Sequence, residues 1–583
     1  MIRNKRIYDG CNKIYRFFIV ILLLFLVSCV ESTIPRQGSS KLNQIKIIKS
    51  DVSFSLKDKK TELLSDAIKV IFHDFHPDNS SDYLSFGFPL PLGFRSEVSF
   101  VAVLDKNGLE IPSHINSAVN YFDFMGIKSR PRSLKITIDR RYASNEGYVY
   151  ISLKMKHKKF IELPAGYKVR NEWSYFKDKN YSGFSTLKEP SIYASLPAAW
   201  LVKCNLLGDS IELMAYPEMG WFDRAYINFS HTAVNNVSPF VKPEYLIPLT
   251  DRAEPWLFDR TKTLFGIYIR TGDVFWLRHA HRSAEYYRHK INVDGFFSLK
   301  KTNDLKYSYP LSLALALIFT ADLDILPVIR KTVNSTLDWP DHYTNRKKFW
   351  TERHQNYALL AAMIGYQITG ERSYKLRTLK LIENSYKMIN SIDSEWISSD
   401  CMLHTMHSHE GVYDSRPVCS PWMSALFSET LMLYHSVSND ERALDMIKSF
   451  ADFITIHSLY TDKRYSKFQN LLVPWYLASG SVKFSDSGFF SDWDHACDVA
   501  GLLARGVLIK KKLSELTLDA EDKLNKLLNA CFSNLENAYR HDSDHSYGKP
   551  VWRLSPSRKY NWIFGSTFEL PRLMKEIDKK FTE

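Results

Sequence analysis

The sequence predicts a chain of mixed fold class, with an N-terminal β-barrel or β-sandwich followed by an α/α toroid of helical hairpins. Two observations predict it. From about residue 43 to residue 250, apolar and polar residues tend to alternate and turn residues interrupt them often, as in antiparallel β structure. From residue 251 to residue 583 the spacing becomes helical and a short connector motif recurs. We therefore expect a β-rich domain at 43–250 and a toroid domain at 251–583.

Residues 1–28 have the pattern of a secretory signal. Basic residues precede an apolar run from Phe17 to Val27, which is short for a membrane span. The run ends in Leu26-Val27-Ser28-Cys29, which resembles the lipobox of bacterial lipoproteins. We expect cleavage before Cys29, lipidation of Cys29 and a tether over residues 29–42, with an uncleaved anchor or a plain secreted protein as the alternative. Because Val30 is not Asp, the outer membrane of a bacterial cell envelope is favoured over the inner membrane.

Composition restricts the partners. The chain carries a formal net charge of +13, and removing five Lys/Arg and one Asp with the signal leaves about +9. An exported basic protein favours anionic partners such as acidic glycans and lipid head groups. The sequence has no compact Lys/Arg tract and no aromatic RNA-binding motif, which excludes nucleic acid.

The cysteines after the signal do not have metal-cluster spacing. Apart from Cys29, they are Cys204, Cys401, Cys419, Cys497 and Cys531. Without a CxxC pair, we expect neither a metal cluster nor a cofactor. Cys401 and Cys419 could form a disulfide in an oxidising compartment.

The β-rich segment has strand patterns separated by turns. Val98 to Leu104 precedes the turn Asp105-Lys106-Asn107-Gly108, and Leu134 to Ile138 and Tyr148 to Leu153 follow. No long amphipathic helix is expected before about Pro248. A sandwich or a barrel accommodates such short strands.

The helical segment contains a repeat of about 49 residues. Its connectors are Thr271-Gly272-Asp273, Thr320-Ala321-Asp322 and Thr369-Gly370-Glu371, with Ser438-Asn439-Asp440 as a looser fourth copy. Such residues suit the end of one helix and the start of the next. The predicted apolar stripes are Leu277, Ala280, Ala284 and Tyr287; Leu379, Ile382, Tyr386 and Ile389; and Leu444, Ile447, Ala451 and Ile454. Hairpins repeated in this way must stack or close into a ring, which would be an α/α toroid.

A β domain followed by hairpins with Thr-Gly-Asp connectors resembles carbohydrate-active proteins with an α/α toroid, especially polysaccharide lyases. The segments Phe86 to Gly93, Val98 to Leu104 and Gly108 to Pro112 resemble the opening of the RIFT-type β-barrel of exo-rhamnogalacturonan lyase-like proteins. This resemblance covers most of the mature chain. It implies a RIFT-type barrel and an acidic polysaccharide or oligosaccharide as substrate.

A histidine-rich segment is the densest polar cluster. It runs from Cys401 to Gly411 and contains His404, His407, His409 and Glu410, with Tyr413 and Arg416 nearby. Sugar chemistry is one interpretation, and a loop in which the imidazoles only form hydrogen bonds is another. Zinc binding is weaker, because the spacing matches neither HExxH nor a zinc finger.

Three further segments combine aromatic and charged residues. The first is Trp350 to Tyr357, with Glu352, Arg353, His354 and Asn356 at a predicted helix start; an N-cap with solvated charges is its alternative. The second contains Asp492, Trp493, Asp494 and His495, and the third contains Arg558, Tyr560 and Trp562. Packing around a helix start would explain the last two equally well.

Three functions fit these segments. For β-elimination at a uronate, we expect Asn356 and Arg353 near the carboxylate, His404 or His407 as the base, and Tyr413 or Tyr560 as the acid. The expected substrate-binding residues are Trp350, Glu352, His354, Glu410, Trp493, Asp494, His495, Arg558 and Trp562. For glycoside hydrolysis, the paired carboxylates would come from Glu352, Glu410, Asp492 and Asp494. A non-catalytic glycan-binding or assembly lipoprotein is the third possibility.

Overall fold

The computed structural model describes residues 64, 66–75, 82–125, 129–142, 147–163, 167–169, 172–176, 187–234, 252–342, 351–390, 400–407, 415–463, 470–485, 492–543 and 558–579. They all belong to one compact unit spanning Lys57–Glu583. The predicted signal, the tether, Cys29, Trp350, Glu410 and Tyr413 lie outside the described residues. Within the described ranges, no helix combines the length and the apolar character needed to cross a membrane.

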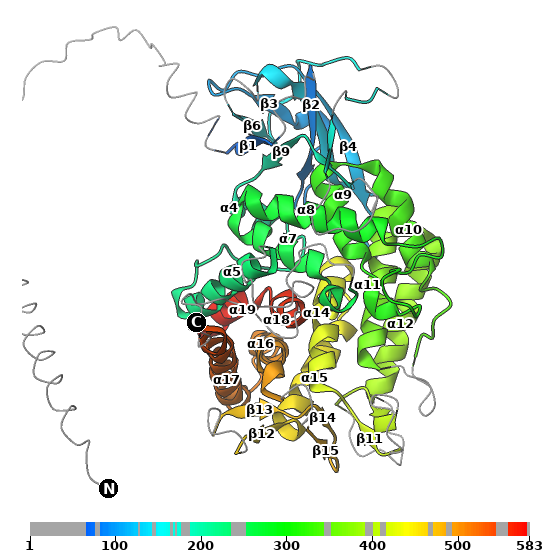
Figure 1. Cartoon of the computed structure of the whole chain (residues 1–583), viewed down its shortest axis with the longest axis vertical. Coiled ribbons are helices and arrows are strands. Elements are labelled where there is room, and N and C mark those ends of the chain that lie inside the picture. The colour runs from blue at the N-terminus through cyan, green and yellow to red at the C-terminus, as the bar shows by residue number, and fades with distance from the viewer. Residues whose placement is uncertain are drawn as a thin grey trace, which may run out of the picture. The chain divides into compact units, whose positions relative to one another are not determined.

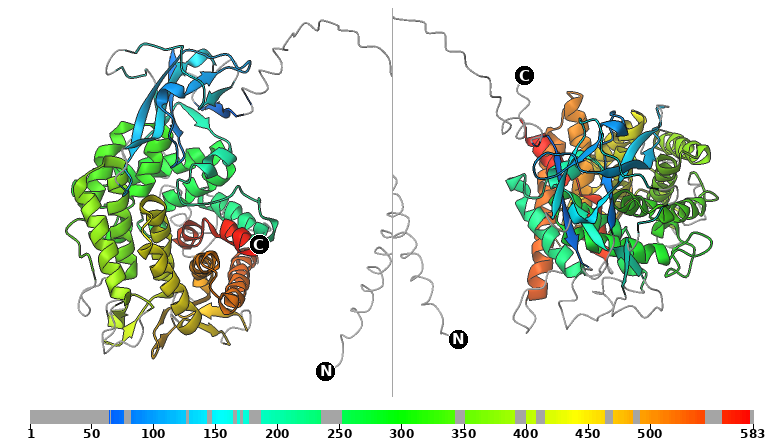
Figure 2. Two further views of the ribbon diagram at one scale, coloured as in Figure 1. Left: turned by 180° about the vertical axis from the view of Figure 1, so that it is seen from behind. Right: turned by 90° about the horizontal axis from the view of Figure 1, so that it is seen from above.

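The β part consists of short antiparallel strands gathered beside α9 and α4 (Figure 1 and Figure 2). One sheet has the order β3-β6-β1-β9, a second has the order β2-β5-β4, and β7 pairs with β8. The strands are β1 Ile68–Asp74, β2 Tyr83–Pro89, β3 Ala102–Leu104, β4 Ser113–Tyr121, β5 Arg130–Asp139, β6 Tyr148–Ser152, β7 Trp173–Phe176, β8 Leu187–Pro190 and β9 Ile192–Ser195.

The predicted antiparallel β structure is confirmed, whereas the predicted barrel is not. Across the described strands, the pairings form separate sheets that do not close on one another. The edge strands β4 and β9 contact helices instead, β4 against α11 and α9 and β9 against α8. A helix that covers a sheet edge removes the need to close the sheet.

Helices begin earlier than the sequence pattern indicates. Residues 198–234, predicted as part of the β-rich domain, contain α4 at Ala198–Lys203 and α5 at Gly220–Val234. In α5 the buried side chains Phe222, Tyr226 and Phe229 recur at helical spacing. The β prediction is therefore wrong for this stretch, because aromatic residues suit a buried helix as well as a strand.

Twelve of the described helices form hairpins in which one helix is buried nearly all round and the other on one face. The first set is α7 Arg260–Thr271, α9 Pro310–Thr320, α11 Glu352–Thr369, α14 Pro421–Ser438, α16 Ala496–Lys512 and α18 Arg558–Ser566. Their partners are α8 Val274–His289, α10 Leu326–Asn334, α12 Arg372–Asn390, α15 Arg442–His457, α17 Leu518–Ser543 and α19 Leu570–Asp578. Each helix of the first set contacts the next, and α18 contacts α7 (Figure 1). The predicted ring of hairpins is therefore confirmed, and we call the first set the inner helices.

The predicted connectors share one hydrogen-bonding pattern. In each, the Thr or Ser hydroxyl accepts a hydrogen bond from the backbone N–H of the acidic residue two positions later, at 3.1–3.2 Å. The middle residue has a positive φ, as in Gly272 at 68° and Gly370 at 72°. This left-handed residue ends the inner helix and lets the chain reverse. Each connector joins the end of an inner helix to the start of its antiparallel partner, which returns the chain to the start of the next inner helix. The inner helices therefore all run in the same direction.

The β part lies against the ends of the inner helices. The backbone N–H of Phe122 donates to the carbonyl of Gln367 at 3.0 Å, and that of Phe124 donates to Val437 at 3.2 Å. Both acceptors lie in the last turn of an inner helix, α11 and α14 respectively. The opposite end of the ring, where the inner helices begin, is therefore built by the loops that precede them.

Candidate functional site

The start of α11 holds a buried acid and histidine. Glu352 is fully buried, and its Oε1 accepts a hydrogen bond from the Ser420 backbone N–H at 2.8 Å. Its Oε2 lies 3.3 Å from Nδ1 of His404. Ser420 is the N-cap of α14, so this carboxylate joins two inner helices and His404. A carboxylate in this position stabilises an imidazole that has accepted a proton.

A short hairpin holds His404 in place. Strand β10, His404–Thr405, pairs with β11, Pro417–Val418. The disulfide between Cys401 and Cys419 links the two sides of this hairpin. Since Cys419 precedes Ser420, the same disulfide positions the backbone N–H that binds Glu352.

His354 has a structural position in the same turn. Its Nδ1 accepts a hydrogen bond from the Thr351 backbone N–H at 3.2 Å, which completes a capping box. The predicted N-cap is therefore present at this helix start, but His354 is buried rather than solvated.

Aromatic rings from three inner-helix starts stack on one another. The His495 ring stacks on both Trp422, with ring centroids 4.8 Å apart, and Trp562, with centroids 5.0 Å apart, and the two Trp centroids lie 6.5 Å from each other. His495 Nδ1 lies 3.1 Å from Oδ2 of Asp498, and burial raises the pKa of this carboxyl while His495 opposes the rise. Trp422 belongs to the first turn of α14, His495 precedes α16, and Trp562 lies on α18.

One cation, Arg353, contacts this stack, and two others, Lys306 and Arg558, interact electrostatically with Arg353. The Arg353 guanidinium lies 5.3 Å from the Trp422 ring centroid, close enough for a cation–π interaction. Burial and repulsion by Arg353 together lower the pKa of Lys306 to about 8, while Asp304 opposes the shift. Arg353 also interacts electrostatically with Arg558.

Among the described residues, no carboxylate contacts Arg353 directly, although Asp304 attracts it at longer range. Arg353 is 8% exposed, and no described carboxylate lies within 4.0 Å of it. Its Nε makes no hydrogen bond to the described chain. Burial lowers the pKa of Arg353, as expected for a cation removed from water. An anion placed here would offset that loss of hydration.

The other predicted residues occupy different surroundings. Asn356 lies one turn beyond Glu352 on α11, and its Oδ1 is buried with no hydrogen-bond partner in the described chain. Asp494 lies 2.6 Å from Nζ of Lys559, and that ammonium lies 5.7 Å from the Trp493 ring centroid.

None of the contacts described above joins Tyr560 or His407 to the aromatic stack. The hydroxyl of Tyr560 lies 2.7 Å from Oγ of Ser230 on α5, and burial raises its pKa above the ordinary value of 10. This environment does not suit the predicted proton donor. His407 is half-buried just after the hairpin strand that carries His404.

Sequence reasoning missed several members of this site, including Lys306, Trp422 and Asp498. Trp422 follows Ser420-Pro421, an N-cap followed by proline that marks a helix start. Lys306 similarly precedes Pro310, the first residue of α9. Searching the start of every helix of the repeat, rather than only segments dense in charged and aromatic residues, would have found both. In the part of the chain described, no cluster of His, Cys, Asp and Glu suits a metal ion.

No family model and no curated protein matches the chain. The predicted relation to exo-rhamnogalacturonan lyase-like proteins therefore stays a prediction. Among solved structures, a family 76 glycoside hydrolase from a Bacteroides thetaiotaomicron strain is 8% identical, with a TM-score of 0.37 over 88% of this chain and 100% of that chain. A mutant unsaturated glucuronyl hydrolase from Streptococcus agalactiae is 12% identical, with a TM-score of 0.35 over 63% and 93%.

A cellobiose 2-epimerase from Bacillus thermoamylovorans is also similar, at 11% identity and a TM-score of 0.36 over 56% of this chain and 87% of that chain. By their names, all three proteins are carbohydrate-active enzymes. Because these TM-scores lie below 0.5, the ring topology of this chain rests on its own helix contacts.

Proposed function

We propose that this protein binds an acidic polysaccharide or oligosaccharide where the inner helices begin and cleaves it by β-elimination at a uronate. The observation that carries the proposal is Arg353, a buried guanidinium without a described carboxylate partner, next in sequence to the Glu352–His404 pair. Ser420 and Trp422, two residues apart, contact Glu352 and Arg353 respectively. The charge-binding group and the acid–histidine pair thus meet at the start of α14.

The residues divide the reaction between them. In this proposal His404 removes the proton beside the uronate carboxylate, and Glu352 stabilises the resulting imidazolium. The electron pair of the broken C–H bond forms the new C=C bond as the bond to the leaving oxygen breaks. Arg353 stabilises the charge that develops on the carboxylate. The proton for the leaving oxygen comes from a tyrosine, for which Tyr413 remains a prediction outside the described residues.

The aromatic rings supply a surface for the sugar. Aromatic rings offer large apolar faces against which the C–H groups of a pyranose ring can pack. In this proposal Trp422 and Trp562 serve that role, while Lys306 and Arg558 add positive charge for neighbouring uronates. These positions also suit a protein that binds the glycan without cleaving it.

We further propose that the protein is exported and anchored by a lipid on Cys29, in the outer membrane of a bacterium. The two disulfides, Cys401–Cys419 and Cys497–Cys531, support this proposal because disulfides persist in oxidising compartments. Replacing Cys29 with Ser should move the protein from the membrane fraction to the soluble fraction of fractionated cells. A Cys29→Ser variant that stays in the membrane fraction would contradict lipid anchoring.

The activity is tested with a panel of acidic polysaccharides. We expect ultraviolet absorbance of an unsaturated uronate to rise together with new reducing ends. His404→Ala should lower the rate by about 100-fold to 10,000-fold, the usual contribution of a general base. His114→Ala, on β4, is the matched control and should keep full activity.

The remaining outcomes separate the alternatives. New reducing ends without absorbance would establish hydrolysis and would direct attention to Glu352, Asp492 and Asp494. If the parent binds a glycan without cleaving it, and His404→Ala and His407→Ala still bind that glycan, the protein is a binding protein. Arg353→Met should abolish binding of acidic glycans, whereas Arg353→Lys should retain part of it because the positive charge is kept.

A further inference from the structure

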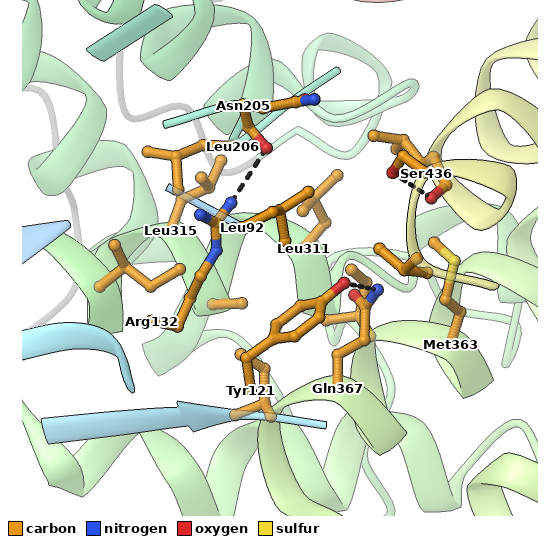
Figure 3. Close-up of a pocket in the computed structure, with 16 residues that line it drawn as sticks. Leu92, Tyr121, Arg132, Asn205, Leu206, Leu311, Leu315, Met363, Gln367 and Ser436 are labelled. Atoms are coloured by element: carbon orange, nitrogen blue, oxygen red, sulfur yellow. Dashed lines mark hydrogen bonds between the residues drawn. The ribbon is translucent and has the colours of Figure 1, made fainter. Parts of the chain in front are cut away.

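A cavity lies at the opposite end of the ring from the candidate site. Its volume is about 300 Å³, and its walls come from α14, α16, α19 and the loop around Gly208. It shares Asn205 and Ser436 with the smaller pocket between the β part and the ring that Figure 3 shows. In that figure Tyr121 and Arg132 approach from the β part and Gln367 from α11. None of the residues assigned above to the candidate site lines either space.

A fixed guanidinium forms one part of the larger cavity wall. Arg505 is 1% exposed; Nη1 donates to Oγ of Ser428 at 3.0 Å, and Nη2 donates to the carbonyl of Ser566 at 2.8 Å. These bonds hold the group rigidly between α14, α16 and α18. Its Nε has no hydrogen-bond partner in the described chain, which leaves a buried donor unsatisfied.

A buried carboxyl group lies close to this guanidinium. Glu569 lines the same cavity, and its Oε1 lies 3.8 Å from Nη2 of Arg505. That distance is too long for a hydrogen bond, and Oε1 has no other partner in the described chain. Each unsatisfied buried group costs about 1–3 kcal/mol, so a molecule in the cavity that both accepts and donates a hydrogen bond would offset the cost at both atoms.

The turn before α5 covers the carboxyl. Gly208 has φ +98°, and a Cβ at this position would lie 3.0 Å from Oε1 of Glu569. Only glycine allows the backbone to approach so closely in this conformation. The turn therefore shields Glu569 from bulk water, and its polar partner must come from within the cavity.

We propose that this cavity binds one neutral monosaccharide unit, with a sugar hydroxyl that accepts from Arg505 Nε and donates to Glu569 Oε1. A hydroxyl can make both bonds at once, whereas a carboxylate or phosphate only accepts and would face a second acid. Leu508 and Leu573 in the lining offer apolar contacts for the C–H groups of the ring. The inference does not depend on the function proposed above, because it concerns a different end of the ring.

The protonation state of Glu569 agrees with a neutral ligand. Burial raises the pKa of Glu569 to about 7, so near neutral pH both forms are populated. A hydroxyl can donate to the ionised form and accept from the protonated form. Sugar binding should therefore persist on both sides of neutrality, unlike the binding of an anion.

The test is calorimetric titration of the full chain, purified in detergent, with D-glucose, D-galactose, D-mannose and L-rhamnose. We expect saturable binding of at least one sugar. Ser436→Trp, at an exposed position in the cavity wall, should weaken that binding about tenfold or more by filling the space, and Ser436→Ala should not. Glu569→Leu should weaken it similarly, and Arg353→Met, at the other end of the ring, should leave it unchanged.

The opposite results overturn the proposal. If none of the four sugars binds, or if binding is equally strong in Ser436→Trp, the cavity is not a sugar site. Binding that is lost in Arg353→Met but kept in Ser436→Trp belongs to the candidate site and likewise overturns it. Because Ser436 is exposed, its variants keep the test decisive even where Glu569→Leu fails to fold.

Discussion

Replacing Glu569 with Gln should change how the stability of the protein depends on pH. Burial raises the pKa of this carboxyl from 4.5 to about 7, against the opposing attraction of Arg505. Between these pH values the folded protein holds a proton that the unfolded chain releases, so the free energy of unfolding falls as pH rises. At about 1.36 kcal/mol per pKa unit, the loss across this window is about 3 kcal/mol. Gln does not titrate, so the variant lacks this contribution.

Urea denaturation at several pH values, with the disulfides intact, measures the difference. From below pH 4.5 to above pH 7, the stability of Glu569→Gln relative to the parent should rise by about 3 kcal/mol. Asp259, whose pKa burial raises to about 6, titrates in both proteins and cancels in the comparison. Glu441→Gln, at an exposed carboxyl, is the control and should follow the parent. Parallel curves for Glu569→Gln and the parent would refute the reasoning.

Three further changes should lower stability for separate reasons. Replacing Cys401 and Cys419 with Ser opens a disulfide that spans 18 residues, which should reduce the free energy of unfolding in urea by about 3 kcal/mol. Gly370 has φ +72°, and a Cβ at this position would lie 2.7 Å from the ring of Phe122. Gly370→Ala should therefore lower the free energy of unfolding by more than the roughly 1–2 kcal/mol that a left-handed backbone costs alone. In the parent, Nη1 of the buried Arg270 lies 2.7 Å from Oδ1 of Asp223. Asp223→Ala leaves this guanidinium buried without its partner, so the free energy of unfolding in urea should fall by about 3–5 kcal/mol.

Each change has its own control. Reductant should destabilise the parent chain but have less effect on the double Ser variant; equal responses would mean that the hairpin disulfide contributes little. Gly480→Ala meets no atom within 4 Å and should be nearly neutral, so an equal loss at both glycines would contradict the steric argument. Replacing Asp223 and Arg270 together by apolar residues should recover part of the loss caused by Asp223→Ala.

The sequence by itself determined the features that depend on neighbouring residues. The connector at Thr271-Gly272-Asp273 was predictable because its hydrogen bond spans two residues and its left-handed position suits glycine. The stripe that includes Leu277, Ala280 and Ala284 was predictable because helical periodicity places these side chains on one face, and all three are buried. The prediction failed in α5, although Phe222, Tyr226 and Phe229 have helical spacing, because aromatic residues are also common in strands.

Only the tertiary structure decided which residues form the candidate site. Arg353, Trp422, His495 and Trp562 come from helix starts separated by tens to hundreds of residues, and they meet because the ring closes. Tyr560, two residues before Trp562, is directed elsewhere because two helical steps turn a side chain by about 200°. Spacing along the chain identifies a helix and its faces, but the packing of the helices around it decides which face meets the site.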